Sequence, residues 1–177
     1  EAFNNVQFAR ERNILFVPGY HDNRIAVFDL RSGSVGSRSS YGRGPSKILT
    51  SPDGRWLAVV NVLSKNVVVL SLPEALLARE ISLPELDFTV DSTPVFSPDS
   101  RTLFIPSLAT GELLAYDLDN ARIRRRVRVG ERPVMVVSSP DRTSIASVDV
   151  GSNDVSVVAL SPHEVYIPHL VQSPNEF

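Results

Sequence analysis

Short hydrophobic runs separated by polar turns recur along this chain, and their pattern is typical of β-strands. Two such runs stand close together in each of four segments, with a polar turn between them. Val, Ile and Leu dominate the runs and turn-forming residues bound them, which favours strands over helices. The first runs occupy residues 14–17, 56–60, 103–105 and 144–148, and the second runs occupy residues 25–30, 67–72, 113–118 and 155–160.

The four segments are copies of one unit. The tripeptide Ser-Pro-Asp occurs at residues 51–53, 97–99 and 139–141, and a degenerate copy begins at Ala9. The starts are 42, 46 and 42 residues apart, and a leucine lies 21 residues after every start. Pro and Asp favour a tight turn because Pro fixes φ and Asp accepts hydrogen bonds from nearby backbone amides. A strand-rich unit that repeats every ~40–45 residues is typical of a propeller blade.

Each unit has room for four strands. A short run precedes each Ser-Pro-Asp turn, and a less regular outer run follows the second long run. Residues 73–79 are one helical turn or the lead into such an outer strand, and we favour the strand. The sequence therefore predicts an all-β fold, a β-propeller with four four-stranded antiparallel blades. The predicted blades are residues 6–42, 46–83, 94–130 and 134–167, and residues 168–177 are the start of a fifth blade or a C-terminal strand.

Stacked sheets bury both faces of their middle strands, so the middle strands supply the predicted core. The residues expected to be mostly buried are Trp56, Leu57, Val59, Val67, Val69, Leu103, Ile105, Val155 and Val157.

An arc of blades that does not close exposes one apolar sheet face at each end, and such patches mark interfaces.

Composition narrows the possible functions. The chain has 177 residues and no cysteine, which excludes disulfides, Cys-ligated zinc, iron–sulfur clusters and thiol nucleophiles. The formal net charge is -2 and the sequence pI is about 5.9, which argues against nucleic acid as a partner. No apolar run approaches the ~18 residues that a membrane span needs, so we expect a soluble chain without membrane insertion.

The arginine-rich segment 122–129 does not change that conclusion. With a period of two, Arg122, Arg124, Arg126 and Arg128 would share one strand face, while the apolar residues of the segment would share the other. This pattern predicts a charged outermost strand, which protects an exposed sheet edge from pairing with other chains.

Four motifs carry a resemblance to a known family. Phe-Val-Pro-Gly, Ala-Val-Val-Asn, Phe-Ile-Pro-Ser and Ala-Ser-Val-Asp, which start at residues 16, 58, 104 and 146, stand where Tyr-Val-Thr-Asn is expected. Gly-x-x-Pro precedes the innermost strand at residues 42–45 and 130–133, and residues 152–158 read Ser-Asn-Asp-Val-Ser-Val-Val. Over residues 6–173 the chain thus resembles the YVTN family of β-propeller repeats, which is similar to cytochrome cd1, haem d1 biosynthesis and lactonase-like propellers.

The resemblance implies a larger ring and a location outside the cytoplasm. Members often have seven blades, which at ~40–45 residues per blade need roughly 300 residues. We therefore expect the remaining blades, a second copy or another protein subunit as partner. A periplasmic or extracellular location is expected as well, with no signal peptide in this chain, which begins with Glu1 and so is either processed or a fragment.

One end of the blades is the predicted ligand face. If Ser-Pro-Asp joins the first two strands, the next turn and the connection between blades both lie at the opposite end, around the axial mouth where propeller ligands bind. The candidate ligand-binding residues on this face are His21, Asp22, Arg43, Asp91, Arg132 and His169.

These candidates allow two kinds of site. We interpret Arg43 and Arg132 as equivalent sites, each just before the proline that opens a blade. They either clamp a carboxylate ligand or pair with the neighbouring blade. His21 and His169 are weak candidates for haem iron or a metal, the alternative being solvated loop side chains. His163 follows the third strand and is expected to be solvated on the other face.

No catalytic constellation is present in the sequence. There is no Gly-x-Ser-x-Gly elbow, phosphate-binding glycine loop or His-Glu-x-x-His. The leading hypothesis is a non-catalytic binding or scaffold propeller whose rim loops hold a partner protein or small ligand, with no cofactor expected. The alternatives are a redox-associated propeller that binds haem d1 or a metal through a rim histidine, and a lactonase-like hydrolase.

Overall fold

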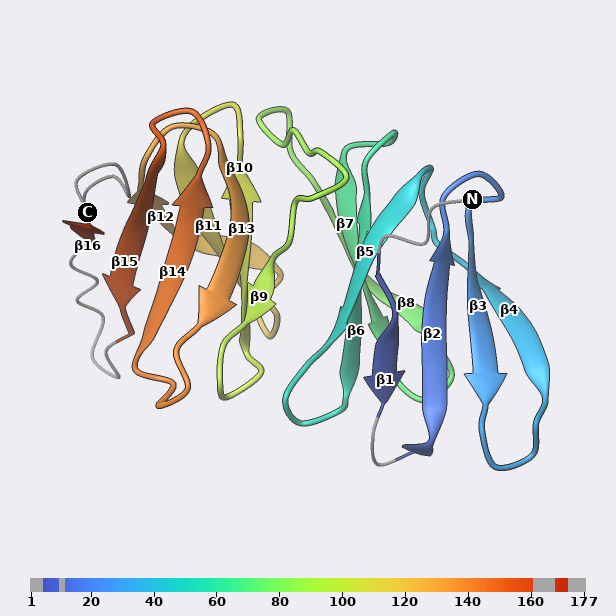
Figure 1. Cartoon of the computed structure of the whole chain (residues 1–177). Helices are drawn as coiled ribbons and strands as arrows, with labels where there is room; N and C mark the ends of the chain where they lie inside the picture. Colours follow the sequence, from blue (N-terminus) through green and yellow to red (C-terminus); the bar gives the residue numbers. More distant parts are fainter. Residues whose placement is uncertain (1–4, 10–11, 161–167, 172–177) are drawn as a thin grey trace. The chain divides into compact units, whose positions relative to one another are not determined.

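The chain folds into four antiparallel sheets (Figure 1). The computed structural model describes residues 5–9, 12–160 and, as backbone, 168–171. Consecutive strands pair in every sheet, so each sheet is a four-stranded meander, as predicted. Sheet 1 comprises β1 (Gln7–Ala9), β2 (Ile14–Gly19), β3 (Arg24–Asp29) and β4 (Val35–Ser39); sheet 2 comprises β5 (Pro45–Thr50), β6 (Trp56–Asn61), β7 (Asn66–Ser71) and β8 (Leu76–Ser82). Sheet 3 comprises β9 (Val95–Phe96), β10 (Thr102–Ser107), β11 (Glu112–Asp117) and β12 (Arg122–Arg128); sheet 4 comprises β13 (Pro133–Ser138), β14 (Ser144–Asp149), β15 (Asp154–Ala159) and β16 (Pro168–Val171).

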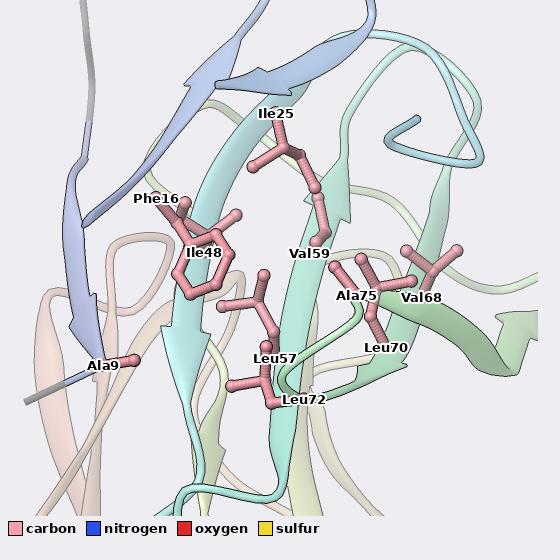
Figure 2. Close-up of a cluster of buried hydrophobic side chains, with 10 residues drawn as sticks. All are labelled: Ala9, Phe16, Ile25, Ile48, Leu57, Val59, Val68, Leu70, Leu72 and Ala75. Atoms are coloured by element: carbon pink, nitrogen blue, oxygen red, sulfur yellow. The ribbon is translucent and has the colours of Figure 1, made fainter. Parts of the chain in front are cut away.

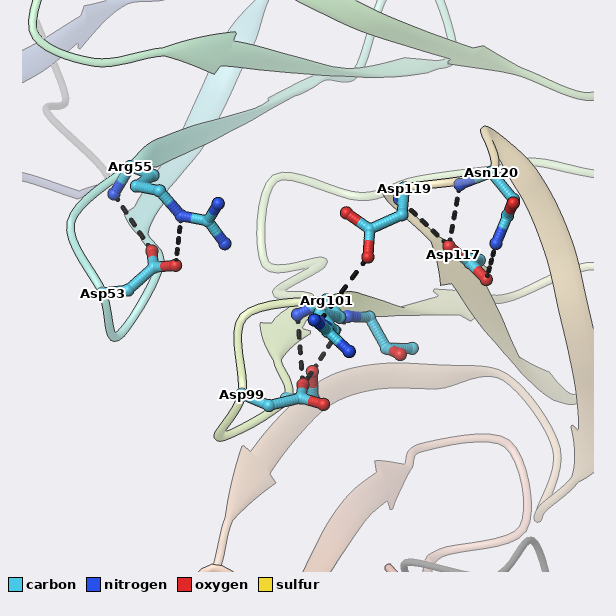
Figure 3. A network of polar contacts seen from close by, with 9 residues as sticks. Asp53, Arg55, Asp99, Arg101, Asp117, Asp119 and Asn120 are labelled. Atoms are coloured by element: carbon cyan, nitrogen blue, oxygen red, sulfur yellow. Dashed lines mark hydrogen bonds and ion pairs between the residues drawn. The ribbon is translucent and has the colours of Figure 1, made fainter.

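The Ser-Pro-Asp turns join the first and second strands of sheets 2, 3 and 4 and are built alike. In sheet 3 the Ser97 hydroxyl donates to Asp99 at 2.6 Å and accepts a hydrogen bond from the Thr102 amide at 2.9 Å. The Asp99 carboxylate also accepts from the Arg101 amide at 3.1 Å (Figure 3). The same three contacts recur in the turns that begin at Ser51 and Ser139. These turns therefore set the register of the strands that follow them.

A second repeated turn joins the third and outer strands of sheets 1 and 3. The Asp117 carboxylate accepts hydrogen bonds from the amides of Asp119 and Asn120 at 3.0 and 2.9 Å (Figure 3). Asp29 does the same for Arg31 and Ser32 in sheet 1. The Asn120 side chain, which donates to Asp117, and these backbone amides hold the pKa of Asp117 below its usual value.

The described residues within 1–84 and 88–91 form one compact unit, and those within 85–87 and 92–177 form a second. In the first unit Phe16 and Ile25 of sheet 1 pack on Ile48, Leu57 and Leu70 of sheet 2, and all five are at most 1% exposed (Figure 2). The second unit has the equivalent core between sheets 3 and 4, formed by Phe104, Leu113, Val136, Ile145 and Val158.

Six of the nine predicted core residues are fully buried: Leu57, Val59, Val67, Val69, Leu103 and Ile105. The other three are only half-buried. Trp56 opens β6 beside the turn, and the Arg55 guanidinium lies 5.8 Å from the centre of its ring. Val155 and Val157 lie on the face of sheet 4 that points away from sheet 3, because the alternate residues Ser156 and Val158 are the buried ones.

Of the two interpretations of the C-terminal segment, a fifth blade is wrong for residues 168–171, and a C-terminal strand fits them. β16 pairs antiparallel with β15, so it is the outermost strand of sheet 4. Four or five residues separate the third and outer strands in sheets 1 to 3, whereas eight separate β15 from β16. β16 starts 29 residues after Ser139, whereas β8 and β12 start 25 residues after Ser51 and Ser97, so the outer strand of sheet 4 starts four residues late. His163 lies outside the described residues.

The arginine-rich strand β12 is outermost in sheet 3, as predicted, but its alternation is broken. A bulge opposite Ala115 and Tyr116 shifts the register, and Ile123 pairs with Tyr116 while Arg126 pairs with Leu114. Tyr116 and Leu114 share a face, so Ile123 lies on the face of Arg126. The prediction that all four even-numbered arginines face one side is therefore wrong.

Residues 73–79 lead into the strand β8, which confirms the favoured interpretation. Among the described residues, no helix has the length and hydrophobicity that crossing a membrane requires.

Candidate functional site

In each unit, the segment that connects the two sheets is hydrogen-bonded to the turn between the second and third strands of the second sheet. In the first unit, residues 40–44 lead from β4 to β5, and the Arg43 carbonyl accepts a hydrogen bond from the Leu63 amide in the β6–β7 turn at 3.1 Å. In the second unit, residues 129–132 lead from β12 to β13, and the Glu131 carbonyl accepts from the Gly151 amide in the β14–β15 turn at 2.8 Å. Each segment ends with the first three residues of a Gly-x-x-Pro motif, whose proline opens β5 or β13, and we call the two segments the Gly-x-x-Pro connections.

Polar side chains of sheet 2 form hydrogen bonds with the backbone of the connection in the first unit. Asn61, at the end of β6, donates to the Ser40 carbonyl at 3.1 Å, and Asn66, at the start of β7, donates to the Tyr41 carbonyl at 3.4 Å. The Ser64 hydroxyl accepts from the Arg43 amide at 2.9 Å. The backbone of this exposed loop is therefore tied to side chains of the sheet.

The second unit repeats this arrangement with acidic residues. The Gly130 amide donates to Asp149 Oδ2 at 3.0 Å and to the Ser156 hydroxyl at 3.1 Å. The Glu131 amide donates to Ser152 at 2.8 Å, just as the Arg43 amide donates to Ser64. Asp149 stands where Asn61 stands, because each lies 19 residues after the first glycine of its motif.

The first glycine of each motif is required by close packing. A Cβ at Gly42 would lie 2.5 Å from Asn61 Nδ2, and a Cβ at Gly130 would lie 2.4 Å from Asp154 Oδ1. Any other residue would push the connection off the buried side chains that hold it.

Asp149 is the most unusual group in this arrangement. Its side chain is fully buried, and while Oδ2 also accepts from the Ser156 hydroxyl at 2.6 Å, Oδ1 has no hydrogen-bond partner. Burial raises the pKa of the Asp149 carboxyl above its ordinary value, although the hydrogen bonds from Ser156 and Gly130 act in the opposite direction.

The prediction that Arg43 and Arg132 are equivalent is wrong. Arg43 is the second residue of its motif and corresponds to Glu131, since both donate their amides to a serine of the turn below. Arg132 corresponds to Gly44, and both have a positive φ, 53° and 65°. Opposite charges therefore occupy equivalent places, so the repeat does not build a symmetric pair of arginines. Arg43 and Arg132 belong to different units and both are exposed.

The remaining candidates lie on turns or beside them. His21 and Asp22 are exposed in the β2–β3 turn, where the His21 ring meets the Tyr20 ring edge-on at 5.3 Å between centroids. Asp22 Oδ1 accepts from the Arg24 amide at 3.4 Å, so this carboxylate has a turn-forming role. Asp91 is exposed in the first unit. His169 is paired through its backbone with Val157 in sheet 4.

No group of three or more His, Cys, Asp or Glu residues that could hold a metal ion occurs in the part of the chain that the structure describes. None of the site residues predicted from the sequence is Asp149, Asn66, Ser64 or Ser152. The signal that could have found them is the constant spacing between the Gly-x-x-Pro motif and the polar residues at 19, 22 and 24 positions after its first glycine.

No protein-family model matches the chain, and no curated protein matches it in sequence. Solved structures do match. Hydrazine synthase from Kuenenia stuttgartiensis superposes with a TM-score of 0.73 at 21% identity, over 94% of this chain and 48% of that chain. A candidate 6-phosphogluconolactonase from Bacteroides uniformis superposes with a TM-score of 0.71 at 16% identity, over 94% of this chain and 54% of that chain.

Together with the four repeated meanders, these likenesses establish a β-propeller fold. The chain spans about half the length of both structures that it matches. At this level of identity the likeness extends to the fold alone, and the more specific resemblance to YVTN repeats stays a prediction.

Proposed function

We propose that this chain is the binding part of a β-propeller, and that it presents the Gly-x-x-Pro connections and the adjoining turns to a small anionic ligand or an acidic segment of a partner protein. One observation carries the proposal. The backbone of each connection is tied to side chains of the sheet below, while the side chains at its tip are exposed. A rigid backbone with free side chains loses little conformational entropy when a ligand binds.

The chemistry of the tips favours an anion. Arg43 and Arg132 are exposed, and neither guanidinium makes a hydrogen bond or ion pair with another described residue. A guanidinium binds carboxylate and phosphate groups through paired hydrogen bonds, so an unpaired one on a fixed loop is suited to such a ligand. The redox and lactonase alternatives rest on the likeness of folds alone.

Calorimetric titration with 6-phosphogluconate tests the proposal, because this compound carries both a carboxylate and a phosphate. We expect measurable binding by the wild type and a loss of about tenfold or more in affinity for Arg132→Ala, since a charge-assisted hydrogen bond contributes roughly 1.5–3 kcal/mol. Arg43→Ala tests the connection of the first unit in the same way.

Arg142→Ala is the matched control. Arg142 is also an exposed arginine of the second unit, but it lies in the Ser-Pro-Asp turn at the opposite end of sheet 4. Its replacement should leave the affinity unchanged. No binding by the wild type, or an equal loss in the Arg142 and Arg132 variants, would contradict the proposal that these connections hold an anionic ligand.

A further inference from the structure

One face of sheet 1 is apolar and uncovered. Phe8, Leu15, Phe28 and Val35 follow one another as cross-strand partners from β1 to β4, so they share a face. Phe8 is 47% exposed and Val35 is 65% exposed. The opposite face of the same sheet carries Phe16 and is buried against sheet 2.

The repeat shows what normally covers this face. The residues that lie 42 positions after Leu15 and Phe28 are Leu57 and Leu70 of sheet 2, and both are fully buried in the core shared with sheet 1. In sheet 4 the corresponding residues are Ile145 and Val158, which are buried in the core shared with sheet 3. The uncovered face of sheet 1 is therefore the one that receives a preceding sheet wherever the structure shows such a contact.

Sheet 4 presents the complementary face. Met135, Val148 and Val155 are cross-strand partners and share the face that points away from sheet 3. Met135 is 39% exposed, and Val137, the next residue of β13 on this face, is 47% exposed. The counterpart of Val155 in sheet 1 is Ile25, which is fully buried against sheet 2. The uncovered face of sheet 4 thus corresponds to the face of sheet 1 that packs against the next sheet along the chain.

We propose that a second copy of this chain covers both faces, so that sheet 4 of each copy packs on sheet 1 of the other. One chain carries both the face that receives a preceding sheet, on sheet 1, and the face that receives a following sheet, on sheet 4. Two copies can therefore pack head to tail without another protein. Such interfaces form closed rings when the rotation closes. Two copies supply eight sheets, the upper end of the ~4–8 blades found in propellers, and a third copy would exceed it. Two copies also match the length of the solved structures, of which one copy spans about half.

Light scattering of the purified chain tests the proposal. One copy has a mass of 19.4 kDa, and we expect a species of twice that mass which dissociates on dilution. Phe8→Glu on sheet 1 and Val137→Glu on sheet 4 should each weaken the dimer by more than about 100-fold, because a buried unpaired charge costs several kcal/mol. Both positions are half exposed in the single chain, so both variants should fold, which circular dichroism and melting verify. Val35→Glu replaces Phe8→Glu if that variant does not fold.

A mixing experiment separates this arrangement from any other dimer. Each variant alone carries a charge in both contacts of a head-to-tail pair, whereas a mixed pair of Phe8→Glu and Val137→Glu has one intact contact. Mixing should therefore restore partial association. Leu76→Glu, at a residue of β8 that is 57% exposed, is the control and should stay dimeric. A monomeric wild type, dimeric face variants, monomeric Leu76→Glu or no recovery on mixing would each overturn the proposal.

Discussion

Replacing Asp149 with asparagine should stabilise the chain at neutral pH and flatten its pH dependence. Asp149 is fully buried, and its Oδ1 has no hydrogen-bond partner. The residue in the equivalent place of sheet 2, Asn61, is a neutral amide that is also fully buried. Asparagine has nearly the same shape, and its amide oxygen can still accept from the Gly130 amide and the Ser156 hydroxyl. The substitution therefore removes the charge and leaves the rest of the site in place.

Two opposing contributions set the size of the effect. Removing an incompletely paired buried charge gains several kcal/mol. The hydrogen bonds from Gly130 and Ser156 would be made to a neutral acceptor instead of a charged one, which lowers stability by about 1 kcal/mol each. The side-chain nitrogen of the new asparagine would be buried without a partner, which costs about 1 kcal/mol more. The raised pKa of Asp149 shows that burial outweighs the hydrogen bonds. We expect Asp149→Asn to be about 1 kcal/mol more stable at pH 7, which raises Tm by roughly 2–4 °C for a chain of this size.

The pH dependence of stability shows whether the charge of Asp149 stabilises or destabilises the folded chain. The folded-state pKa of Asp149 lies above the ordinary value of 3.8, so the folded chain binds this proton more tightly than the unfolded chain. The contribution of the group to the free energy of unfolding is complete below pH 3.8 and is lost as the pH rises through the folded-state pKa. The advantage of Asp149→Asn should therefore appear as the pH rises above 3.8 and through the folded-state pKa of Asp149, as followed by thermal melts.

The reciprocal variant Asn61→Asp is the matched test. It replaces the donor to the Ser40 carbonyl with a carboxylate, which should cost about 3 kcal/mol at pH 7 and less at acidic pH. If Asp149→Asn melts lower than the wild type at pH 7, or if its pH profile runs parallel to that of the wild type, the reasoning about burial is refuted.

Three further substitutions test the fold. Val69→Asp places a charge at a fully buried position of β7 and should abolish cooperative melting, so an unchanged Tm would contradict the packing described for sheet 2. Ser97→Ala removes the hydroxyl that bridges Asp99 and the Thr102 amide and should lower the free energy of unfolding by about 1–2 kcal/mol in urea titrations. The Ser139 hydroxyl and the Thr143 amide hold the pKa of Asp141 below 3.8, a contribution present above that pH and lost as the pH falls further. Asp141→Asn should thus flatten the acid side of the stability profile, and an unchanged acid side would count against this turn.

The repeat was sufficient to predict the sheets and their turns. The contacts of Ser97 and Asp99 all lie within the six residues 97–102, so they depend on local geometry that the motif itself determines. The buried middle strands followed from the same register. The half-buried state of Val155 did not, because it depends on what covers the far face of sheet 4 rather than on the strand itself.

Other features depend on pairing between distant residues. The bulge opposite Ala115 arises from the fit of β12 to β11 and has no mark in the arginine pattern. The pairing of β16 with β15 follows an eight-residue connection that breaks the regular spacing. The candidate face was predicted from topology. Aligning the two Gly-x-x-Pro motifs already places Arg43 on Glu131, and the contacts with Ser64 and Ser152 confirm this correspondence.

Amide hydrogen exchange measured by NMR tests directly whether the exposed connections are held rigid by side chains of the adjoining sheet and of its β6–β7 or β14–β15 turn. The amides of Arg43, Gly130 and Glu131 belong to surface loops, but Gly130 donates to the buried Asp149, and Arg43 and Glu131 donate to the turn serines Ser64 and Ser152. We expect these three amides to exchange at least about 100-fold more slowly than in an unstructured peptide. Exchange at the rate of a free peptide would show that the connections open independently of the sheets, and it would contradict the account.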